Sequence, residues 1–357
     1  MDTNNQSVDQ KDKAAAVRDR LGRAFQSLRI SLIDRCNFRC FYCMPESVFG
    51  DYYPFLEKSE WMSFDEIVRL VRIFGGLGVT RLRLTGGEPL LRPQLPVLVR
   101  RLVDLNHIED LALTTNGTRL AGMAGLLADA GLPRITISLD SIEQSVLTRI
   151  SGSKALIGPV IDGIDAAQAA GLEVKINAVI VKDVNESQII PLAQFARDRR
   201  VTLRFIEFMD VGNCNRWDMR RVVTEASIRA MLDSRFGLEP VTLGHASETA
   251  NRFRYVDQPD TEVGFVSSVT LPFCADCNRG RLSADGKLFT CLFSSAGTDL
   301  LGAMRSGLDD ASLRNLVESV WLRRLDRYSE ERAGILAGSG QQSQSPASKV
   351  EMSYIGG

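Results

Sequence analysis

The sequence predicts an α/β protein, in which a partial, open (β/α)6 barrel of the TIM type precedes a smaller C-terminal α+β domain. Strand-like and helix-like segments alternate from Leu28 to Met209, which favours a parallel sheet covered by helices. Six such units are too few to close an eight-stranded barrel. Polar or glycine-rich segments follow the strands, at the edge where barrel enzymes carry their active sites.

The six candidate strands are short: Leu28–Ile33, Arg81–Thr85, Asp110–Thr115, Arg134–Leu139, Glu173–Ile180 and Thr202–Met209. The helices predicted between them are amphipathic: Phe64–Phe74, Gln94–Leu105, Gly122–Ala130, Ala155–Ala170 and Ile189–Arg197. Ser63 and Glu66 have the spacing of a capping box, which predicts where the first helix begins.

The pattern changes after Met209, which predicts a second domain. Expected helices are Thr224–Arg235, Leu300–Arg305 and Ala311–Arg324, and expected short antiparallel strands are Phe253–Val256, Val263–Thr270 and Arg281–Thr290. We therefore divide the chain into a flexible N-terminal tail (1–20), the barrel (21–222), a C-terminal domain for a metal cluster and substrate (223–337), and a second flexible tail (338–357). The second tail is rich in Ser, Gln and Gly and ends in Gly356-Gly357.

Composition excludes several classes of protein. A net charge of −1 gives no reason to expect nucleic acid or an anionic membrane as a partner. Without an 18-residue apolar stretch or a secretory signal, the 357-residue chain is expected to be a cytoplasmic protein. Seven cysteines in a reducing compartment favour metal binding over disulfides.

Six of the cysteines form two groups of three. These are Cys36, Cys40 and Cys43, and then Cys274, Cys277 and Cys291. Closely spaced thiolates hold zinc or iron–sulfur clusters, but a structural zinc site needs four protein ligands. A 4Fe–4S cluster held by three thiolates leaves one iron free for a substrate or cofactor. Cys214 lies outside both groups and is either a plain thiol or a fourth ligand.

Cationic residues recur on the predicted barrel strands. Arg81 and Arg83 are two residues apart and face one side of a strand, and Arg279 and Arg281 repeat this spacing. Further cations on barrel strands are Arg29, Lys175 and Arg204. Single members of the set could form salt bridges to Glu88, Glu207 or Asp140. Together they predict a polyanionic substrate, most simply a triphosphate.

Two motifs carry a resemblance to known enzymes. A Cys-x3-Cys-x2-Cys loop directly after the first strand, with Tyr42 before its last cysteine, resembles the signature of radical S-adenosylmethionine (SAM) enzymes. Gly86-Gly87-Glu88-Pro89 resembles the motif with which that superfamily holds the methionine amino group.

From about Leu21 to Gly357 the chain further resembles the GTP 3′,8-cyclase family of molybdenum cofactor biosynthesis. The segments that carry this resemblance are Leu28–Met44, Arg81–Pro89, Arg204–Met209, Cys274–Arg281 with Cys291, and the terminal Gly356-Gly357.

The resemblance implies a barrel of the radical SAM type with two 4Fe–4S clusters, each held by one cysteine group, and SAM on the first. It implies SAM contacts at Tyr42, Gly87, Glu88, Ser138 and Met209. It implies GTP contacts at Arg29, Arg81, Arg83, Thr114, Lys175, Arg204, Arg279 and Arg281. The catalytic residues that it implies are Arg279, Arg281, Gly356 and Gly357.

The implied reaction converts GTP to (8S)-3′,8-cyclo-7,8-dihydroguanosine 5′-triphosphate. A 5′-deoxyadenosyl radical abstracts the ribose H3′, and the C3′ radical attacks guanine C8. The implied partners are a reductant such as flavodoxin or ferredoxin, a downstream cyclic pyranopterin monophosphate synthase, and a second copy in a homodimer. Two alternatives remain open: a radical SAM enzyme that modifies peptides and carries an auxiliary cluster, and a zinc-stapled binding protein.

Overall fold

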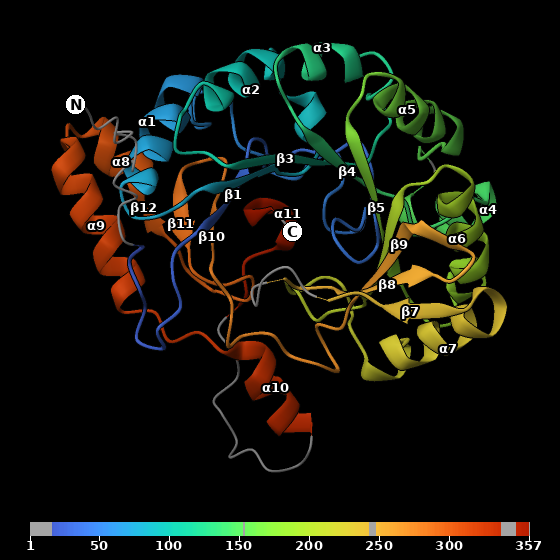
Figure 1. The fold of residues 1–357 in the computed structure, drawn as a ribbon. Helices are drawn as coiled ribbons and strands as arrows, with labels where there is room; N and C mark the ends of the chain where they lie inside the picture. Colours follow the sequence, from blue (N-terminus) through green and yellow to red (C-terminus); the bar gives the residue numbers. More distant parts are fainter. Residues whose placement is uncertain (1–15, 153, 243–247, 337–347, 357) are drawn as a thin grey trace, which may run out of the picture.

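The strands of the protein form one continuous sheet. The computed structural model describes residues 16–152, 154–242, 248–336 and 348–356. In these ranges the sheet is 12-stranded, with the order β12-β11-β10-β1-β2-β3-β4-β5-β6-β9-β8-β7. The sheet curves around an interior in which the C-terminal helix α11 lies, while α1 to α6 cover its outside (Figure 1).

The element bounds follow the sequence-based expectations closely in the first half of the chain. The strands there are β1 (Ser27–Ser31), β2 (Arg81–Thr85), β3 (Asp110–Thr115), β4 (Arg134–Ser138), β5 (Glu173–Ile180) and β6 (Thr202–Glu207). The helices are α1 (Phe64–Gly75), α2 (Leu95–Val103), α3 (Ala124–Asp129), α4 (Gln144–Ser151), α5 (Ile157–Ala169) and α6 (Ile189–Asp198). Helix α4 was not among the expected elements.

The second half contains shorter strands and five more α-helices in the described ranges. The strands are β7 (Leu238–Pro240), β8 (Asn251–Tyr255), β9 (Gln258–Val266), β10 (Arg279–Leu282), β11 (Lys287–Phe289) and β12 (Thr298–Asp299). The helices are α7 (Glu225–Phe236), α8 (Leu300–Arg305), α9 (Asp310–Leu322) and α10 (Tyr328–Leu336), and α11 (Met352–Ile355) follows near the end.

The partial barrel is confirmed, and the C-terminal region extends it. Strands β1 to β6 pair in parallel, β10 adds in parallel beside β1, and β9 adds in parallel beside β6. Antiparallel strands then continue both edges. In the described ranges β9 and β10 do not pair, so the barrel stays open. A domain boundary at residue 222 therefore remains a prediction about independent folding, because the sheet itself does not break there.

Local chemistry explains where the elements begin and end. The capping box is present: Glu66 N donates to Ser63 Oγ (3.2 Å), and Ser63 N donates to Glu66 Oε2 (2.6 Å). Helix α1 buries one face, including Ile67 and Val71, against the sheet. Such fully buried aliphatic side chains each contribute about 1.5–3 kcal/mol to folding.

One strand expected from the sequence is interrupted. The segment Arg281–Thr290 is divided into β10 and β11, which pair antiparallel. Ser283 Oγ accepts a hydrogen bond from Lys287 N (2.9 Å), and Gly286 has φ +71. The left-handed glycine and the side-chain-to-backbone hydrogen bond form a tight turn. The local sequence pattern predicts one continuous strand here because it does not reveal this turn.

The sequence analysis placed residues 16–20 and 348–356 in flexible tails, which stays a prediction about mobility, and the structure gives both segments buried side chains. Asp19 is buried and pairs with Arg23 Nε (2.6 Å) and with Arg324. At the other end Ser353 and Ile355 are buried. Both segments are held by contacts with residues distant in the sequence, which local composition does not reveal. Residues 1–15, 337–347 and 357 lie outside the described ranges.

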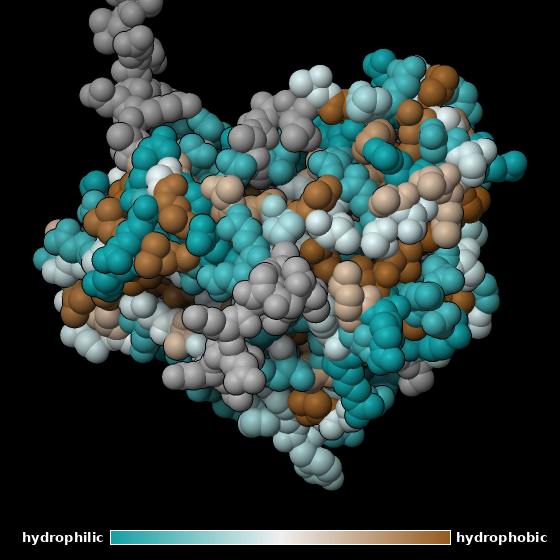
Figure 2. Space-filling view, turned by 90° about the horizontal axis from the view of Figure 1, so that it is seen from below, coloured by the Kyte–Doolittle hydropathy of each residue, from teal (hydrophilic) through white to brown (hydrophobic). Residues whose placement is uncertain are grey.

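The surface seen from below intersperses hydrophilic and hydrophobic residues (Figure 2). No helix in the described ranges is both long enough and apolar enough to cross a lipid bilayer.

Candidate active site

Both cysteine groups line one cavity of about 340 Å³. The first group lies on the loop after β1. Cys274 and Cys277 precede β10, and Cys291 follows β11. Because β10 pairs with β1, the fold brings together two groups that are far apart in the sequence. All seven cysteines of the chain are free thiols.

The cysteines of the first group are partly buried. Burial raises the pKa of Cys36 to about 12, and it also raises the pKa of Cys40 and Cys43, to which the neighbouring thiols add. Asn116 Nδ2 lies 3.8 Å from Cys36 Sγ. Such thiols stay protonated until a cation replaces their protons, and three thiols that line one cavity are a donor set of the kind that holds an iron–sulfur cluster.

The second group has a different electrostatic environment. Burial by itself would raise the pKa of Cys277, but the guanidinium groups of Arg279 and Arg324 outweigh burial and lower it to about 6. Arg324 Nη2 donates to Cys277 Sγ (3.2 Å). Burial raises the pKa of Cys291 to about 11. Arg324 follows α9, and no local motif marks it, so the sequence analysis did not find it.

The turn after β2 allows a ligand to approach the backbone closely. Gly86 has φ +144, and a Cβ on Gly87 would lie 2.2 Å from the carbonyl oxygen of Arg35. Side chains are therefore excluded at both positions, and Gly86 and Gly87 both line the cavity.

Glu88 joins this turn to the end of β3. Its Oε1 accepts hydrogen bonds from Thr115 Oγ1 (2.6 Å) and Leu90 N (2.9 Å), and its Oε2 accepts one from Asn116 N (2.8 Å). Burial raises the pKa of the carboxyl group, and the three donors act against that shift. Oε2 keeps capacity for one further donor at the cavity wall.

The other predicted SAM contacts, Tyr42, Ser138 and Met209, line the same cavity. Tyr42 donates to Asp140 Oδ2 (2.6 Å), and Val179 N donates to Asp140 Oδ1 (2.8 Å). Burial raises the pKa of Asp140 to about 6. The sequence places Asp140 just past β4, at the edge of the sheet where the active site is expected, but assigns it no role beyond that of a counter-ion.

Arginines form a row across three strands. Arg29 on β1 is in register with Arg281 on β10 and with Arg83 on β2. Burial lowers the pKa of Arg83 to about 9 and of Arg281 to about 10, and neighbouring guanidiniums add to both shifts. Within the described ranges no carboxylate forms an ion pair with any of these three arginines. Arg281 is buried, and Arg29 and Arg83 are partly buried. Adjacent shielded cations without an ion-pair partner make a strong anion site.

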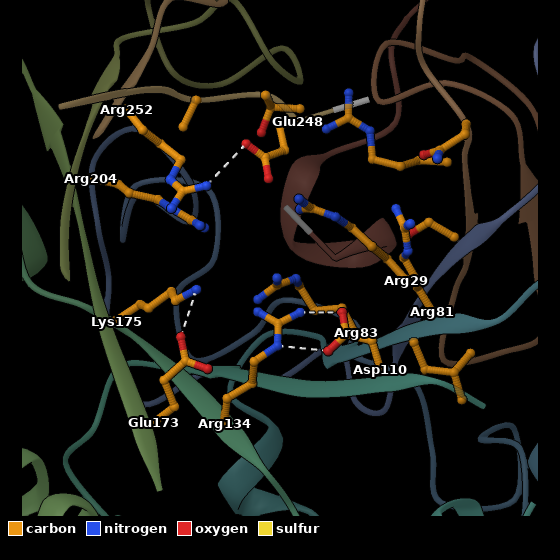
Figure 3. A pocket seen from close by; sticks show the side chains of 16 residues that line it. Arg29, Arg81, Arg83, Asp110, Arg134, Glu173, Lys175, Arg204, Glu248 and Arg252 are labelled. Carbon is orange, nitrogen blue, oxygen red and sulfur yellow. Dashed lines mark hydrogen bonds and ion pairs between the residues drawn. The ribbon is translucent and has the colours of Figure 1, made fainter. Parts of the chain in front are cut away.

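A second cavity of about 300 Å³ adjoins the first, with Arg29, Arg83, Arg204 and Arg279 lining both. Predicted substrate residues Arg81 and Lys175 line only this second cavity. Here carboxylates accompany the cations (Figure 3): Lys175 Nζ lies 2.8 Å from Glu173 Oε1, and Arg252 Nη1 lies 3.6 Å from Glu248 Oε2. Arg134 forms a two-pronged contact with Asp110.

The remaining predicted site residues have distinct places. Thr114 lines the first cavity and accepts a hydrogen bond from Arg83 Nη1 (3.2 Å). The Gly356 carbonyl accepts a hydrogen bond from Arg281, whereas Gly357 lies outside the described residues.

The seventh cysteine, Cys214, does not line the cavity that the two cysteine groups share. Cys214 Sγ lies 3.2 Å from Glu351 Oε2 and 3.9 Å from the Cys43 carbonyl, and Cys214 is not among the residues that line the cavity. Its thiol therefore lies beside the first group and contacts Glu351 rather than the cavity.

The open parallel barrel with three cysteines after its first strand defines a radical SAM protein. The Radical SAM superfamily model matches residues 30–196, and Molybdenum Cofactor Synthesis C matches residues 201–330. Streptococcus suis SuiB bound to S-adenosylmethionine shares the fold, with a TM-score of 0.60 at 15% identity over 87% of this chain and 69% of that one.

Relatives in sequence specify the family. The GTP 3′,8-cyclase of Acidothermus cellulolyticus is 48% identical, covering 96% of this chain and 99% of its own length. Those of Xanthomonas campestris and Staphylococcus aureus are 48% and 42% identical, each again covering 96% of this chain, and 98% and 99% of their own lengths. The chain belongs to the GTP 3′,8-cyclase family and is an enzyme of the radical SAM superfamily. This assignment sets aside a zinc-stapled binding protein.

Proposed function

We propose that the chain converts GTP to (8S)-3′,8-cyclo-7,8-dihydroguanosine 5′-triphosphate, the first step of molybdenum cofactor biosynthesis. One observation carries the proposal most directly: both cysteine groups and the row of Arg281, Arg29 and Arg83 line a single cavity. A site with two groups of soft metal ligands and a cationic wall is suited to redox chemistry on a polyanionic nucleotide.

Each cysteine group is proposed to hold one 4Fe–4S cluster by three ligands, with SAM on the first and the guanine base on the second. Bound there, the first cluster and SAM supply the 5′-deoxyadenosyl radical. The residues of the chain orient the cofactor. Gly87 lets its methionine portion approach the backbone, and Glu88 Oε2 can accept from its ammonium group. Asp140 holds the Tyr42 ring, and Ser138 and Met209 complete the wall.

The cations divide the work of binding the triphosphate. Arg29, Arg83, Arg204 and Arg279 line both cavities, so the phosphate chain can pass from the first cavity into the second. Arg81 and Lys175 then meet its far end, where phosphate oxygens compete with the carboxylates already present. Thr114 supports Arg83, and Arg281 holds Gly356 close to the reacting portion of the site.

The test is an anaerobic assay of cluster-reconstituted protein with SAM, a strong reductant and GTP deuterated at C3′. Mass spectrometry should find deuterium in 5′-deoxyadenosine. It should also find a GTP-derived product whose amount rises in parallel with that of deuterated 5′-deoxyadenosine. Unlabelled 5′-deoxyadenosine without that product would support the assignment to radical SAM enzymes but would contradict GTP as the substrate. That outcome would favour the peptide-modifying alternative.

Cysteine substitutions test the cluster assignment. Cys291→Ser should halve the iron content and abolish cyclisation, because it removes one of three ligands. Cys214→Ser should keep both clusters, because its thiol faces Glu351 rather than the cavity. Loss of iron from the Cys214 variant would show that this residue is a ligand after all.

The proposed surroundings of the reaction follow from its chemistry. A reductant such as flavodoxin or ferredoxin supplies electrons in the cytoplasm, and a cyclic pyranopterin monophosphate synthase consumes the product. A homodimer is proposed as the working assembly, which analytical ultracentrifugation of the reconstituted protein would test.

A further inference from the structure

The C-terminal segment 348–356 is fastened to the loop that follows β6. Only Ser353, Ile355 and Gly356 in this segment are buried, and α11 is a single short helix. Ordering a chain segment costs conformational entropy at every residue, and one helical turn does not persist alone. Specific anchors must therefore hold the segment in place.

The first anchor is a cation that is largely shielded from solvent. Lys349 Nζ donates to the Asp210 carbonyl (2.9 Å), to Asp210 Oδ2 (3.1 Å) and to the Tyr328 hydroxyl (2.7 Å). The side chains of Lys349 and Asp210 are only 11% and 13% exposed. Arg332 also contacts Asp210, so this carboxylate ties α10 to the same point. Every donor position of the ammonium group is satisfied.

The second anchor is a set of reciprocal hydrogen bonds. Glu351 Oε1 accepts from Asn213 N (3.0 Å) and Asn213 Nδ2 (3.1 Å), while Asn213 Oδ1 accepts from Lys349 N (3.0 Å). Gly212 makes room for the carboxylate, since a Cβ there would lie 2.1 Å from Glu351 Oε2. Asn213 bonds both Lys349 and Glu351. A shift of either the loop after β6 or the tail segment would therefore break several hydrogen bonds at once.

Both anchors adjoin the reaction cavity. Asp210 directly follows Met209, and Glu351 directly precedes Met352, and both of these methionines line the cavity. We propose that Asp210, Asn213, Lys349 and Glu351 form a clasp whose role is to place Gly356 against Arg281. These are positioning residues, and their effect on turnover rests on the proposed function.

The clasp is tested by limited trypsin digestion of the full-length, reconstituted protein. Cleavage after Lys349 needs its side chain in the protease pocket, and the clasp denies that access. Asn213→Ala and Glu351→Ala should each accelerate this cleavage at least tenfold. The two substitutions should be less than additive in the double variant, because the Asn213 side chain bonds Glu351 directly. Glu331→Ala, at an exposed position of α10, is the matched control and should leave the rate unchanged.

Measuring turnover of the same variants distinguishes a loss of tail positioning from a general loss of folding or of clusters. In the two clasp variants kcat for cyclisation should fall at least tenfold, while KM for GTP changes less than about threefold, because the arginine row is untouched. Iron content and Tm should stay at the unsubstituted values. Glu351→Gln, which keeps an oxygen acceptor for Asn213, should restore most of the protection and turnover.

Slow cleavage after Lys349 in both variants would overturn the clasp. Fast cleavage with undiminished kcat would overturn its positioning role. If the unsubstituted protein did not cyclise GTP, the proposed function would fall, yet the digestion would still decide whether the clasp exists.

Discussion

The guanidinium of Arg281 donates a hydrogen bond to the backbone carbonyl of Gly356, and so joins the end of the described chain to the cationic row. Arg281 is buried and lies in register with Arg29. Burial and the neighbouring Arg279 lower its pKa to about 10, which reflects a charge that has few compensating groups. A carbonyl satisfies one donor of the guanidinium and leaves the others for a phosphate.

Gly356→Ala should abolish cyclisation while both clusters remain. A Cβ at this position would lie 2.2 Å from Thr85 Cγ2, and φ is +69, so an alanine cannot occupy the observed place. The measurement is product formation beside iron content. Gly171→Ala is a control for backbone strain alone, because φ is +80 there and no atom lies within 4 Å of the added Cβ. Adding Thr85→Ser to Gly356→Ala should recover part of the activity, since it removes the clashing methyl group.

Gly87→Ala should weaken SAM binding by at least tenfold. The added Cβ would lie 2.2 Å from the Arg35 carbonyl oxygen, and a backbone atom cannot move aside as a flexible side chain can. Isothermal titration of reconstituted protein with SAM measures the effect. Gly158→Ala, where nothing lies within 4 Å, should bind SAM normally. Equal affinities for all three proteins would contradict close approach at this turn.

Lys175→Gln and Glu173→Gln should move KM for GTP in opposite directions. The two side chains form an ion pair at 2.8 Å in the second cavity, so a phosphate must compete with the carboxylate for the ammonium group. Removing the cation should raise KM about tenfold, the effect of roughly 1.4 kcal/mol. Removing the carboxylate should lower KM or leave it unchanged. If both variants raised KM equally, the pair would matter for the shape of the cavity and not for phosphate binding.

The stability of the protein should carry a pH dependence from Asp140. Burial raises its folded-state pKa to about 6, above the value of about 3.9 for an unfolded aspartate. The folded state therefore binds the proton more tightly. Stability should fall as the pH rises from about 4 through 6, by about 2 to 3 kcal/mol in all.

Denaturant unfolding of the metal-free protein at pH 5 and 7.5 tests this, with Asp140→Asn beside it. The unsubstituted protein should lose free energy of unfolding between these values, and the asparagine variant should lose less. Parallel pH profiles would mean that Asp140 does not titrate in this range.

Local pattern was sufficient for most of the barrel. The bounds of β2, β3 and β5 match the expected segments residue for residue, because alternation and turn residues act over a few neighbours. Helix α4 was missed, since Gln144–Ser151 is short and begins without a side-chain cap. The lack of such a cap removes the usual sequence signal for a helix start.

The sequence by itself determined the chemistry available to this protein: two cysteine groups, a glycine turn after the second strand, and paired arginines at strand spacing. These features depend on residues that are close together in the sequence, so they do not depend on how distant parts of the chain fold. Only the tertiary structure decided that β10 pairs with β1, which places Arg281 beside Arg29 and both cysteine groups at one cavity. It also divided the cations between two cavities and fastened the tail through Asn213 and Glu351. Strand register, burial and ion pairing depend on residues hundreds of positions apart, and no local pattern records which of them meet.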